Sequence, residues 1–539
     1  MNLRERTQAI FANLWEQGNC SIRRIAAATG MTKSSVHRHR QAIERRNQYP
    51  ESPLWEMPSG HQWLQRLVWA VVYVFGVKHG IGNDTLSEFF QLLRLERHIG
   101  VSPSALQGVR VKLERQILSY HQEQQKQLQQ VPTKVEVCAG ADETFFEQMV
   151  LVLLDLSSGY IFLEAQAKDR GYQTWQGMVQ QALPSAVEVK YLVSDRAKAL
   201  VKLALEGLGC CSVPDLFHSL RDLGKHIGAR LGRQLSQLEQ QISQAKTKLI
   251  QLQTESKPTQ LQEQKLEQLQ AQYSSTQATQ TAYHAALQQL SLCVHPFAIS
   301  GSEFQSATEV IAALQQQVHR LSTIANAASL PNWQTTVAKF NQQIPAIAAV
   351  VNTWWTWVCH SLSAEQLSPQ TSNWLLTRLL PVVYWQQQLR KTKSPALKLA
   401  YQSAYTHAHR LYSQDSLTPT ISPKELQQWW TWAEWMVNKF QRTSSPVEGR
   451  NGYLSRIHHC GRGLSAHRLQ VLTVIHNFAL HRADGTTAAQ RLFGRPFPDL
   501  FEFIVEHMSD LPLPRSAKKS KKSEVASLHS VPAEIGSRE

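Results

Sequence analysis

The stretch VEVCAGADETFFEQMVLVLLDLSSGYIFLEAQA, residues 135–167, decides the fold. Three runs of apolar and β-branched residues follow one another in it, and SSG at 157–159 makes a tight turn between the last two. This pattern predicts three strands in a meander. A helix over about 172–183 then precedes a fourth strand, VEVKYLVSD at 187–195, and a helix over about 197–208 precedes a short strand ending in SVPD. Such an order predicts an α/β domain with a mixed sheet and helices on its faces.

Two aspartates stand where strands of this sheet are expected to end. Asp142 closes the first run, after small residues that allow tight packing, and Asp195 closes the fourth. Ligands bind beyond the strand ends of open sheets, and carboxylate oxygens suit Mg²⁺. Each aspartate is equally compatible with a helix cap or a turn, so position alone leaves both interpretations open.

A long helical region follows the sheet. Apolar residues in 233–290 repeat at alternating steps of three and four, which predicts a coiled-coil seam: Leu235, Leu238, Ile242, Ala245, Leu249 and Leu252. Because SKPT at 256–259 interrupts the seam, we expect two antiparallel helices in a hairpin, with a zipper between two chains as the alternative. Residues 291–440 are predicted to be helical and rich in tryptophan. These tryptophans are expected in the helical core, or, for one or two, stacked on unpaired bases.

The first 47 residues carry nine Lys/Arg against three Asp/Glu. Ala26, Gly30 and Val36 have the spacing of a helix-turn-helix, in which a small residue allows contact and glycine makes the turn. The second helix would present a polar and basic set to a DNA major groove: Lys33, Ser34, Ser35, His37, Arg38 and Arg40. A basic helical bundle with solvated charges is the alternative.

Residues 48–59 are predicted to be a linker, and residues 60–130 to be helical with a possible second helix-turn-helix. Its last helix would start at Ser102-Pro103. A plain helical connector is the alternative. The lysine-rich tail, residues 511–539, is expected to be disordered.

Bulk properties narrow the class of partner. The net charge of +15 and the pI near 9.5 favour a polyanion such as nucleic acid, although a basic surface also suits anionic membranes. The longest apolar run, 67–77, is too short to span a bilayer, and the charged start lacks a signal core. Seven cysteines form no CxxC pair. We therefore expect a cytoplasmic protein without a membrane segment, a disulfide framework or a zinc site.

A glutamate far downstream has two possible roles. Ser445-Pro446-Val447-Glu448 has the pattern of a capping box, with Glu448 reaching back to the helix start. Polar and cationic residues crowd the same segment, and Arg450, Asn451 and Arg456 are predicted to contact DNA. That surplus favours a phosphate site, and hence a metal ligand, over a cap. A solvated basic face is the alternative for the cations.

The segments ADETFF, LVSDRAKAL, VPDLFHSLRDL and SSPVEGRNGYLSR resemble the DDE transposases of bacterial insertion sequences, in the RNase H-like, retroviral-integrase superfamily. The resemblance covers about 134–225 and 440–508. It implies an RNase H-like core in two parts, 134–232 and 441–510, separated by an all-helical insertion, 233–440. It also implies that Asp142, Asp195 and Glu448 hold two Mg²⁺ or Mn²⁺ ions, and that Asp215 and His218 form a D-x-x-H pair near the cleaved strand. Glu448 follows Asp195 by 253 positions, which is a long spacing for such a core.

The resemblance implies a transposase that binds the terminal inverted repeats of its element, cleaves the DNA there and joins the freed end to target DNA. Two ends must be brought together, so a homodimer or larger assembly on double-stranded DNA in the bacterial nucleoid is expected. Two alternatives remain: an inactive or domesticated DNA-binding derivative, and a related RNase H-like nuclease.

Overall fold

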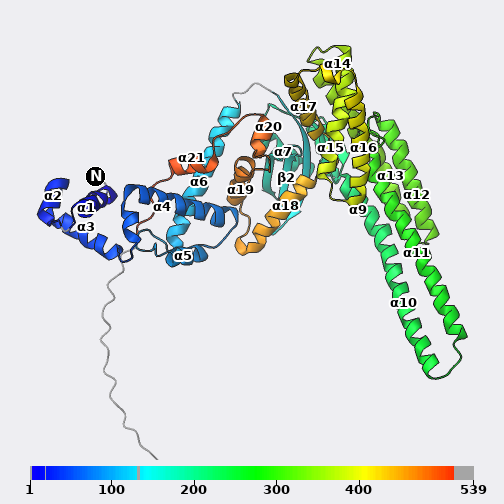
Figure 1. Ribbon diagram of the computed structural model, residues 1–539, viewed down its shortest axis with the longest axis horizontal. Coiled ribbons are helices and arrows are strands. Elements are labelled where there is room, and N and C mark those ends of the chain that lie inside the picture. The colour runs from blue at the N-terminus through cyan, green and yellow to red at the C-terminus, as the bar shows by residue number, and fades with distance from the viewer. Residues whose placement is uncertain (1–2, 19, 130–133, 515–539) are drawn as a thin grey trace, which may run out of the picture. The chain divides into compact units, whose positions relative to one another are not determined.

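The computed structural model describes residues 3–18, 20–129 and 134–514, and the chain forms two compact units (Figure 1). The first unit comprises residues 1–120 and 500–539, and the second comprises residues 121–499. The boundaries between the units fall inside a helix, after Tyr120, and before Leu500, whereas the sequence placed domain boundaries near 130 and 510. The predicted tail lies, from residue 515 on, outside the described residues.

Three short helices open the first unit: α1 (Leu3–Gln17), α2 (Ile22–Thr29) and α3 (Lys33–Arg46). Gly30 ends α2 at φ +68°, a left-handed conformation that glycine adopts without strain. Thr32 caps α3 by accepting a hydrogen bond from the Ser35 amide. Ile25, Val36 and Ile43 are buried together between the three helices.

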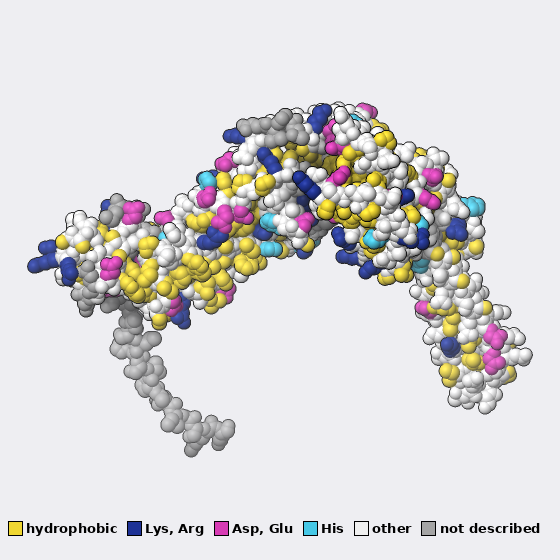
Figure 2. Space-filling view, turned by 45° about the horizontal axis from the view of Figure 1, so that its top comes forward, with side chains coloured by type: hydrophobic (Ala, Val, Ile, Leu, Met, Phe, Trp, Pro, Cys, Tyr) yellow, Lys and Arg dark blue, Asp and Glu magenta, His cyan; other side chains and the backbone are white. Residues whose placement is uncertain are grey.

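The rest of the first unit is helical as well. It contains α4 (Pro58–Val71), a π-helical turn (Val72–Lys78), α5 (Asn83–Leu92), the first part of α6 (Pro103–Gln129) and α21 (Leu500–His507). Helix α6 starts at the predicted residue, and Ser102 Oγ accepts the Ala105 amide hydrogen. Figure 2 shows apolar side chains on the surface of this unit. Trp63, Phe75 and Leu92 are exposed.

The second unit contains a five-stranded mixed sheet in the order β3-β2-β1-β4-β5. The strands are β1 (Val135–Phe145), β2 (Met149–Asp155), β3 (Ile161–Ala167), β4 (Val187–Ser194) and β5 (Cys211–Pro214). The first three pair antiparallel, as the meander predicted, whereas β4 and β5 join parallel to β1. The predicted α/β class and mixed sheet are confirmed.

Helices surround this sheet. Between the strands lie α7 (Tyr172–Ala182) and α8 (Lys198–Lys202), and after β5 come α9 (Leu216–Leu223), α10 (Ala229–Thr254), α11 (Gln260–Cys293), α12 (Ala307–Ala327), α13 (Gln334–Ser363), α14 (Pro369–Trp374), α15 (Leu380–Lys391), α16 (Pro395–Gln414), α17 (Pro423–Asn438), α18 (Ser445–Ile457), α19 (Ala466–Ala479) and α20 (Ala488–Phe493). The second predicted inter-strand helix is shorter than expected and continues as a π-helical turn, Leu203–Gly207. No helix in the described part of the chain is long and apolar enough to span a membrane.

Helices α10 and α11 pack against each other as the predicted antiparallel hairpin within one chain. The seam positions are buried or half-buried, whereas Ile250, outside the seam, is 63% exposed. Tyr273 on α11 donates to Glu239 on α10, over 2.8 Å. Figure 2 shows that uncharged polar side chains dominate the hairpin surface. The polar outer face and the apolar seam together explain why these residues form two paired helices.

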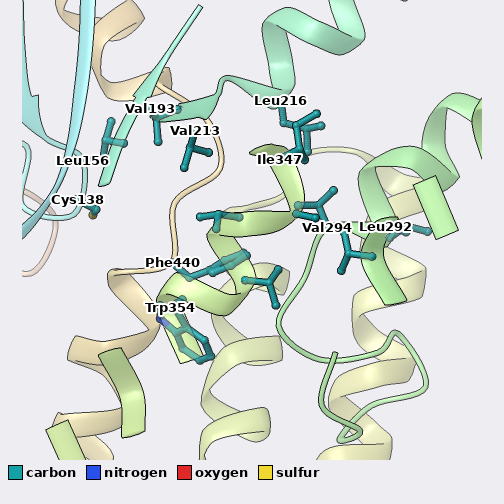
Figure 3. Close-up of a cluster of buried hydrophobic side chains, with 14 of the residues drawn as sticks. Cys138, Leu156, Val193, Val213, Leu216, Leu292, Val294, Ile347, Trp354 and Phe440 are labelled. Atoms are coloured by element: carbon teal, nitrogen blue, oxygen red, sulfur yellow. The ribbon is translucent and has the colours of Figure 1, made fainter. Parts of the chain in front are cut away.

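One continuous apolar core joins the sheet to the later helices (Figure 3). Val193 and Val213 on the sheet belong to the same cluster as Ile347 and Trp354 on α13. Most tryptophans of 291–440 are buried in this cluster or packed against it, as expected for core residues. Trp435 is exposed, at 40%. The helical region is therefore packed onto the sheet as part of one unit.

Candidate functional site

Asp142 and Asp195 come together because of the register between β1 and β4. Gly140 pairs with Val193 in the parallel ladder, an offset of 53 residues, and the same offset separates Asp142 from Asp195. Neighbouring strands lie about 4.8 Å apart. Asp142 is inside β1, three residues before its end, but β4 has already stopped pairing there. The carboxylate therefore stands at the edge that the end of β4 leaves open.

Asp195 follows the last residue of β4 and is exposed. Its Oδ1 accepts the Ala197 amide hydrogen over 2.8 Å, and Arg196 adopts a left-handed φ of +66°. Helix α8 begins two residues further on, with Ala197 at its cap position. Asp195 thus forms a local turn and is not the helix cap.

Gly140 brings the helix that carries Glu448 against β1. A Cβ at this position would lie 2.6 Å from Leu156 Cδ2 and 3.0 Å from Val447 Cγ2. Alternate residues of a strand share a face, so Asp142 is on the face of β1 that α18 covers. The absence of a side chain at Gly140 therefore lets α18 approach the face from which Asp142 projects.

Glu448 does not make the predicted capping box. Helix α18 starts one residue earlier than expected, with Ser444 at the cap position and no side-chain cap hydrogen bond. Instead, Oε1 of the Glu448 carboxylate lies 3.4 Å from Nε2 of His218. Because Ser444 takes the cap position, the glutamate moves beyond the third helical position that a capping box requires.

Asp215 and His218 form the predicted pair at the start of α9. Asp215 caps this helix by accepting the His218 amide hydrogen at Oδ1, and its Oδ2 lies 3.2 Å from His218 Nδ1. The same Oδ2 accepts hydrogen bonds from the amide, over 2.8 Å, and from the hydroxyl of Ser444. His218 therefore stands between Asp215 and Glu448, and Ser444 ties the starts of α9 and α18 together.

Two residues predicted to contact DNA have other roles in α18. Asn451 donates from Nδ2 to Asp142 Oδ2 over 3.1 Å, so it orients a carboxylate of the site. Arg450 is buried and its guanidinium makes two 2.6 Å hydrogen bonds to Glu164 on β3. Arg450 therefore forms a buried ion pair with Glu164 and is not available to contact DNA. Arg456 is exposed, as a DNA contact requires.

The predicted DNA-contact residues of α3 differ in availability. Lys33, Ser34, His37 and Arg38 are exposed, and Ser35 is half-buried. Arg40 is half-buried and already paired, with its Nε 2.9 Å from Glu44 Oε1. Four of the six are therefore exposed on this helix, and two of these, Ser34 and His37, also contact Thr32 and Gln41 by hydrogen bonds.

Burial and charge act together on the ionisable groups of the site. Burial, then the charges of Glu143 and Asp195, raise the pKa of Asp142 to about 6. The interaction with Asp215 raises the pKa of His218 against the opposing effect of burial. Burial opposes ionisation of Asp215, but hydrogen bonds from His218 and Ser444 outweigh it and lower the pKa. The site combines a carboxylate whose pKa is raised with a histidine whose pKa is also raised.

Two of the three predicted metal ligands, Asp142 and Asp195, have the chemistry of a divalent-metal site. Asp142 and Asp195 repel each other, and their oxygens are the hard ligands that Mg²⁺ and Mn²⁺ prefer. Glu448 is directed to His218 instead. Within the ranges that the structure describes, no group of three or more His, Cys, Asp or Glu residues is placed to hold a metal ion.

Three nearby acids have structural roles. Asp155 is buried and accepts hydrogen bonds from the Ser157 hydroxyl and the Ser158 and Cys138 amides, which holds the β2–β3 turn. Asp169 accepts the Gly171 amide hydrogen in a loop. Glu143 pairs with Arg170 over 3.0 Å.

Sequence reasoning missed Ser444, which binds Asp215 from 229 residues away. The double serine before Pro446 was the available signal, but either serine could have been the cap, and the choice depends on the distant Asp215.

Comparisons with known proteins were made over the whole chain. A family model described as a family of unknown function (DUF6399) matches residues 375–520. The match includes Glu448, Asn451 and Ser444, but neither Asp142 nor Asp195. No curated protein and no solved structure matches the chain.

Proposed function

We propose that this protein is a DNA transposase that cleaves DNA at the ends of its element and transfers the strand to a target. The observation that carries the proposal is that Asp142 and Asp195 converge at one sheet edge. Glu448 lies next to His218, which belongs to the same site. The strand order, an antiparallel meander followed by two parallel strands, supports the RNase H-like core that the resemblance implies.

Asp142, Asp195 and Glu448 would hold two Mg²⁺ or Mn²⁺ ions. Bound there, such ions supply an activated oxygen nucleophile and stabilise the leaving oxygen in phosphodiester chemistry. Asn451 orients the Asp142 carboxylate, and Asp215 raises the pKa of His218, which lies beside Glu448. When protonated, the His218 imidazole would attract the phosphate of the strand and could offer a proton to a departing oxygen.

Helices α2 and α3 would supply the recognition of terminal inverted repeats. The turn at Gly30 and the core of Ile25 and Val36 fit a helix-turn-helix, and Lys33, His37 and Arg38 are free to contact a major groove. The net charge of +15 favours a DNA partner. Since two ends must meet, the active form would be at least a dimer.

The test is strand cleavage and strand transfer with a duplex that carries the inverted repeat flanking the gene, in Mg²⁺. The wild type should nick the duplex and join it to a second DNA, and Asp142→Asn should do neither. Equal inertness of both proteins, with DNA binding intact, would identify a domesticated DNA-binding protein. Cleavage without joining would identify a nuclease of the same fold.

A further inference from the structure

A cavity of about 490 Å³ lies in the second unit beside the loop that joins α17 to α18. Three cations, Lys391, Arg442 and Arg482, line it, and its lining includes neither aspartate nor glutamate. Hydroxyl and amide groups make up much of the remaining wall. A concave site with three positive charges and many hydrogen-bond donors suits a phosphate.

The three cations are held differently. Arg442 donates from NH1 to the carbonyl oxygens of Ser291 and Val294, over 2.7 and 2.8 Å, so its charge is fixed in place without a carboxylate. Arg482 donates to the Ser157 carbonyl oxygen over 3.3 Å. The acids that act on its charge are Asp155 and Asp484, and neither lines the cavity.

Lys391, at the end of α15, is exposed and lines this cavity. Burial and the charge of Arg482 lower the pKa of Lys391 to about 8. An ammonium that shares a cavity wall with a second cation is under-compensated, and a bound anion would relieve that cost. Among the described residues, no hydrogen bond or ion pair holds its ammonium group.

The loop that lines the cavity is tied to the candidate active site. The Arg442 carbonyl oxygen accepts the Leu216 amide hydrogen over 3.0 Å, next to Asp215. Ser445 and Pro446, in the wall, begin the helix that carries Glu448. A ligand in the cavity therefore contacts the segment that positions Glu448 and Asp215.

We propose that this cavity binds the phosphate of a nucleotide, and that the nucleotide is one unit of the DNA strand leading to the active site. A single phosphate would leave most of 490 Å³ empty, whereas a nucleotide fills such a volume better. The phosphate site stands by itself. Its assignment to a DNA strand rests on the proposed function.

The full-length chain can be tested with pyridoxal 5′-phosphate, an amine-reactive phosphate, followed by borohydride and peptide mapping. Lys391 should be labelled faster than Lys393, which is exposed like Lys391 but does not line the cavity. Protection of Lys391 by a short single-stranded oligonucleotide supports the strand assignment. Protection by deoxyadenosine monophosphate alone transfers the site to a free nucleotide, which overturns that assignment. Protection by neither overturns the phosphate site.

Binding of a fluorescent oligonucleotide provides the second measurement. Lys391→Gln and Arg482→Gln should each weaken binding about tenfold, because each removes a charge-assisted contact. Lys393→Gln removes the same charge and should change binding less than about twofold. Equal losses in Lys391→Gln and Lys393→Gln would show a general charge effect and overturn the site. Asp142→Asn should bind like the wild type, so failure of cleavage and failure of this site are separable.

Discussion

Asp142 and Asp155 lie on neighbouring strands of one sheet, yet their carboxylates are treated in opposite ways. Asp155 is fully buried and accepts hydrogen bonds from two backbone amides and a hydroxyl. Asp142 accepts from Asn451 and from the Glu143 amide, and faces the like charges of Glu143 and Asp195. The Asp155 carboxylate holds a turn, whereas the charge of the Asp142 carboxylate is under-compensated.

This difference separates structural from functional carboxylates better than position does. Both aspartates follow apolar runs in sequence, and both lie near a strand end. An under-compensated charge costs stability, and such a cost is typical of sites that bind a ligand of opposite charge. The following predictions break or sharpen the contrast between Asp142 and Asp155.

The largest expected effect is on DNA cleavage. Asp142→Asn should lower the cleavage rate of an end-containing duplex by about a thousandfold or more, as the loss of a group acting directly in catalysis does. The matched change Asp155→Asn, assayed at a temperature where it remains folded, should keep the rate within about tenfold of wild type. Equal loss in both variants would remove the distinction between the two aspartates.

The next effect is on folding. Asp155→Asn should lower the free energy of unfolding by about 2 to 4 kcal/mol, because an amide group would face the donors of the β2–β3 turn. Urea denaturation followed by circular dichroism measures this value. A change below about 0.5 kcal/mol would mean that the turn does not depend on the charge of Asp155.

The third effect is a gain in stability, whereas Asp155→Asn is expected to cause a loss. The pKa of Asp142 in the folded protein, about 6, is above its ordinary value, so ionisation costs stability. In metal-free buffer at pH 7, Asp142→Asn should stabilise the protein by about 1 to 3 kcal/mol. The wild type gains this stability as its carboxylate becomes protonated, so the difference should shrink as the pH falls from about 6 towards 4. A variant less stable than wild type at pH 7 would contradict this prediction.

The smallest effect concerns the residue that orients Asp142. Asn451→Ala removes one hydrogen bond to the carboxylate and should slow cleavage about tenfold, with less than about 1.5 kcal/mol lost in stability. Asn451→Asp keeps the size but places another negative charge beside Asp142, and should slow cleavage further. If Asn451→Ala cleaved at the wild-type rate, orientation of Asp142 would not depend on this contact.

Local patterns predicted much of the fold. The apolar runs of 135–195 gave the mixed sheet, and the three-four repeat gave the helical hairpin, because periodicity reports directly which face is buried. The same patterns placed Asp142 and Asp195 near strand ends. Their proximity follows from the register of β1 on β4, which no local pattern contains.

Long-range partners explain what sequence could not predict. Arg450 was expected to face DNA, but Glu164, 286 residues away, buries it in an ion pair. Ser444 displaced the predicted capping box because α18 starts one residue earlier, where its hydroxyl binds Asp215. The proposed phosphate cavity is lined by Lys391, Arg442 and Arg482. These cations come from three separate segments, so no local sequence motif predicts the cavity.

The bond between Ser444 and Asp215 also has a consequence during synthesis. These residues are 229 positions apart, and ribosomes add about 5 to 20 residues per second. For about 10 to 50 seconds, therefore, a nascent chain has Asp142, Asp195 and Asp215 but not the segment that completes their surroundings. If the protein cuts DNA, a growing chain held near its own gene is harmless until translation is almost finished.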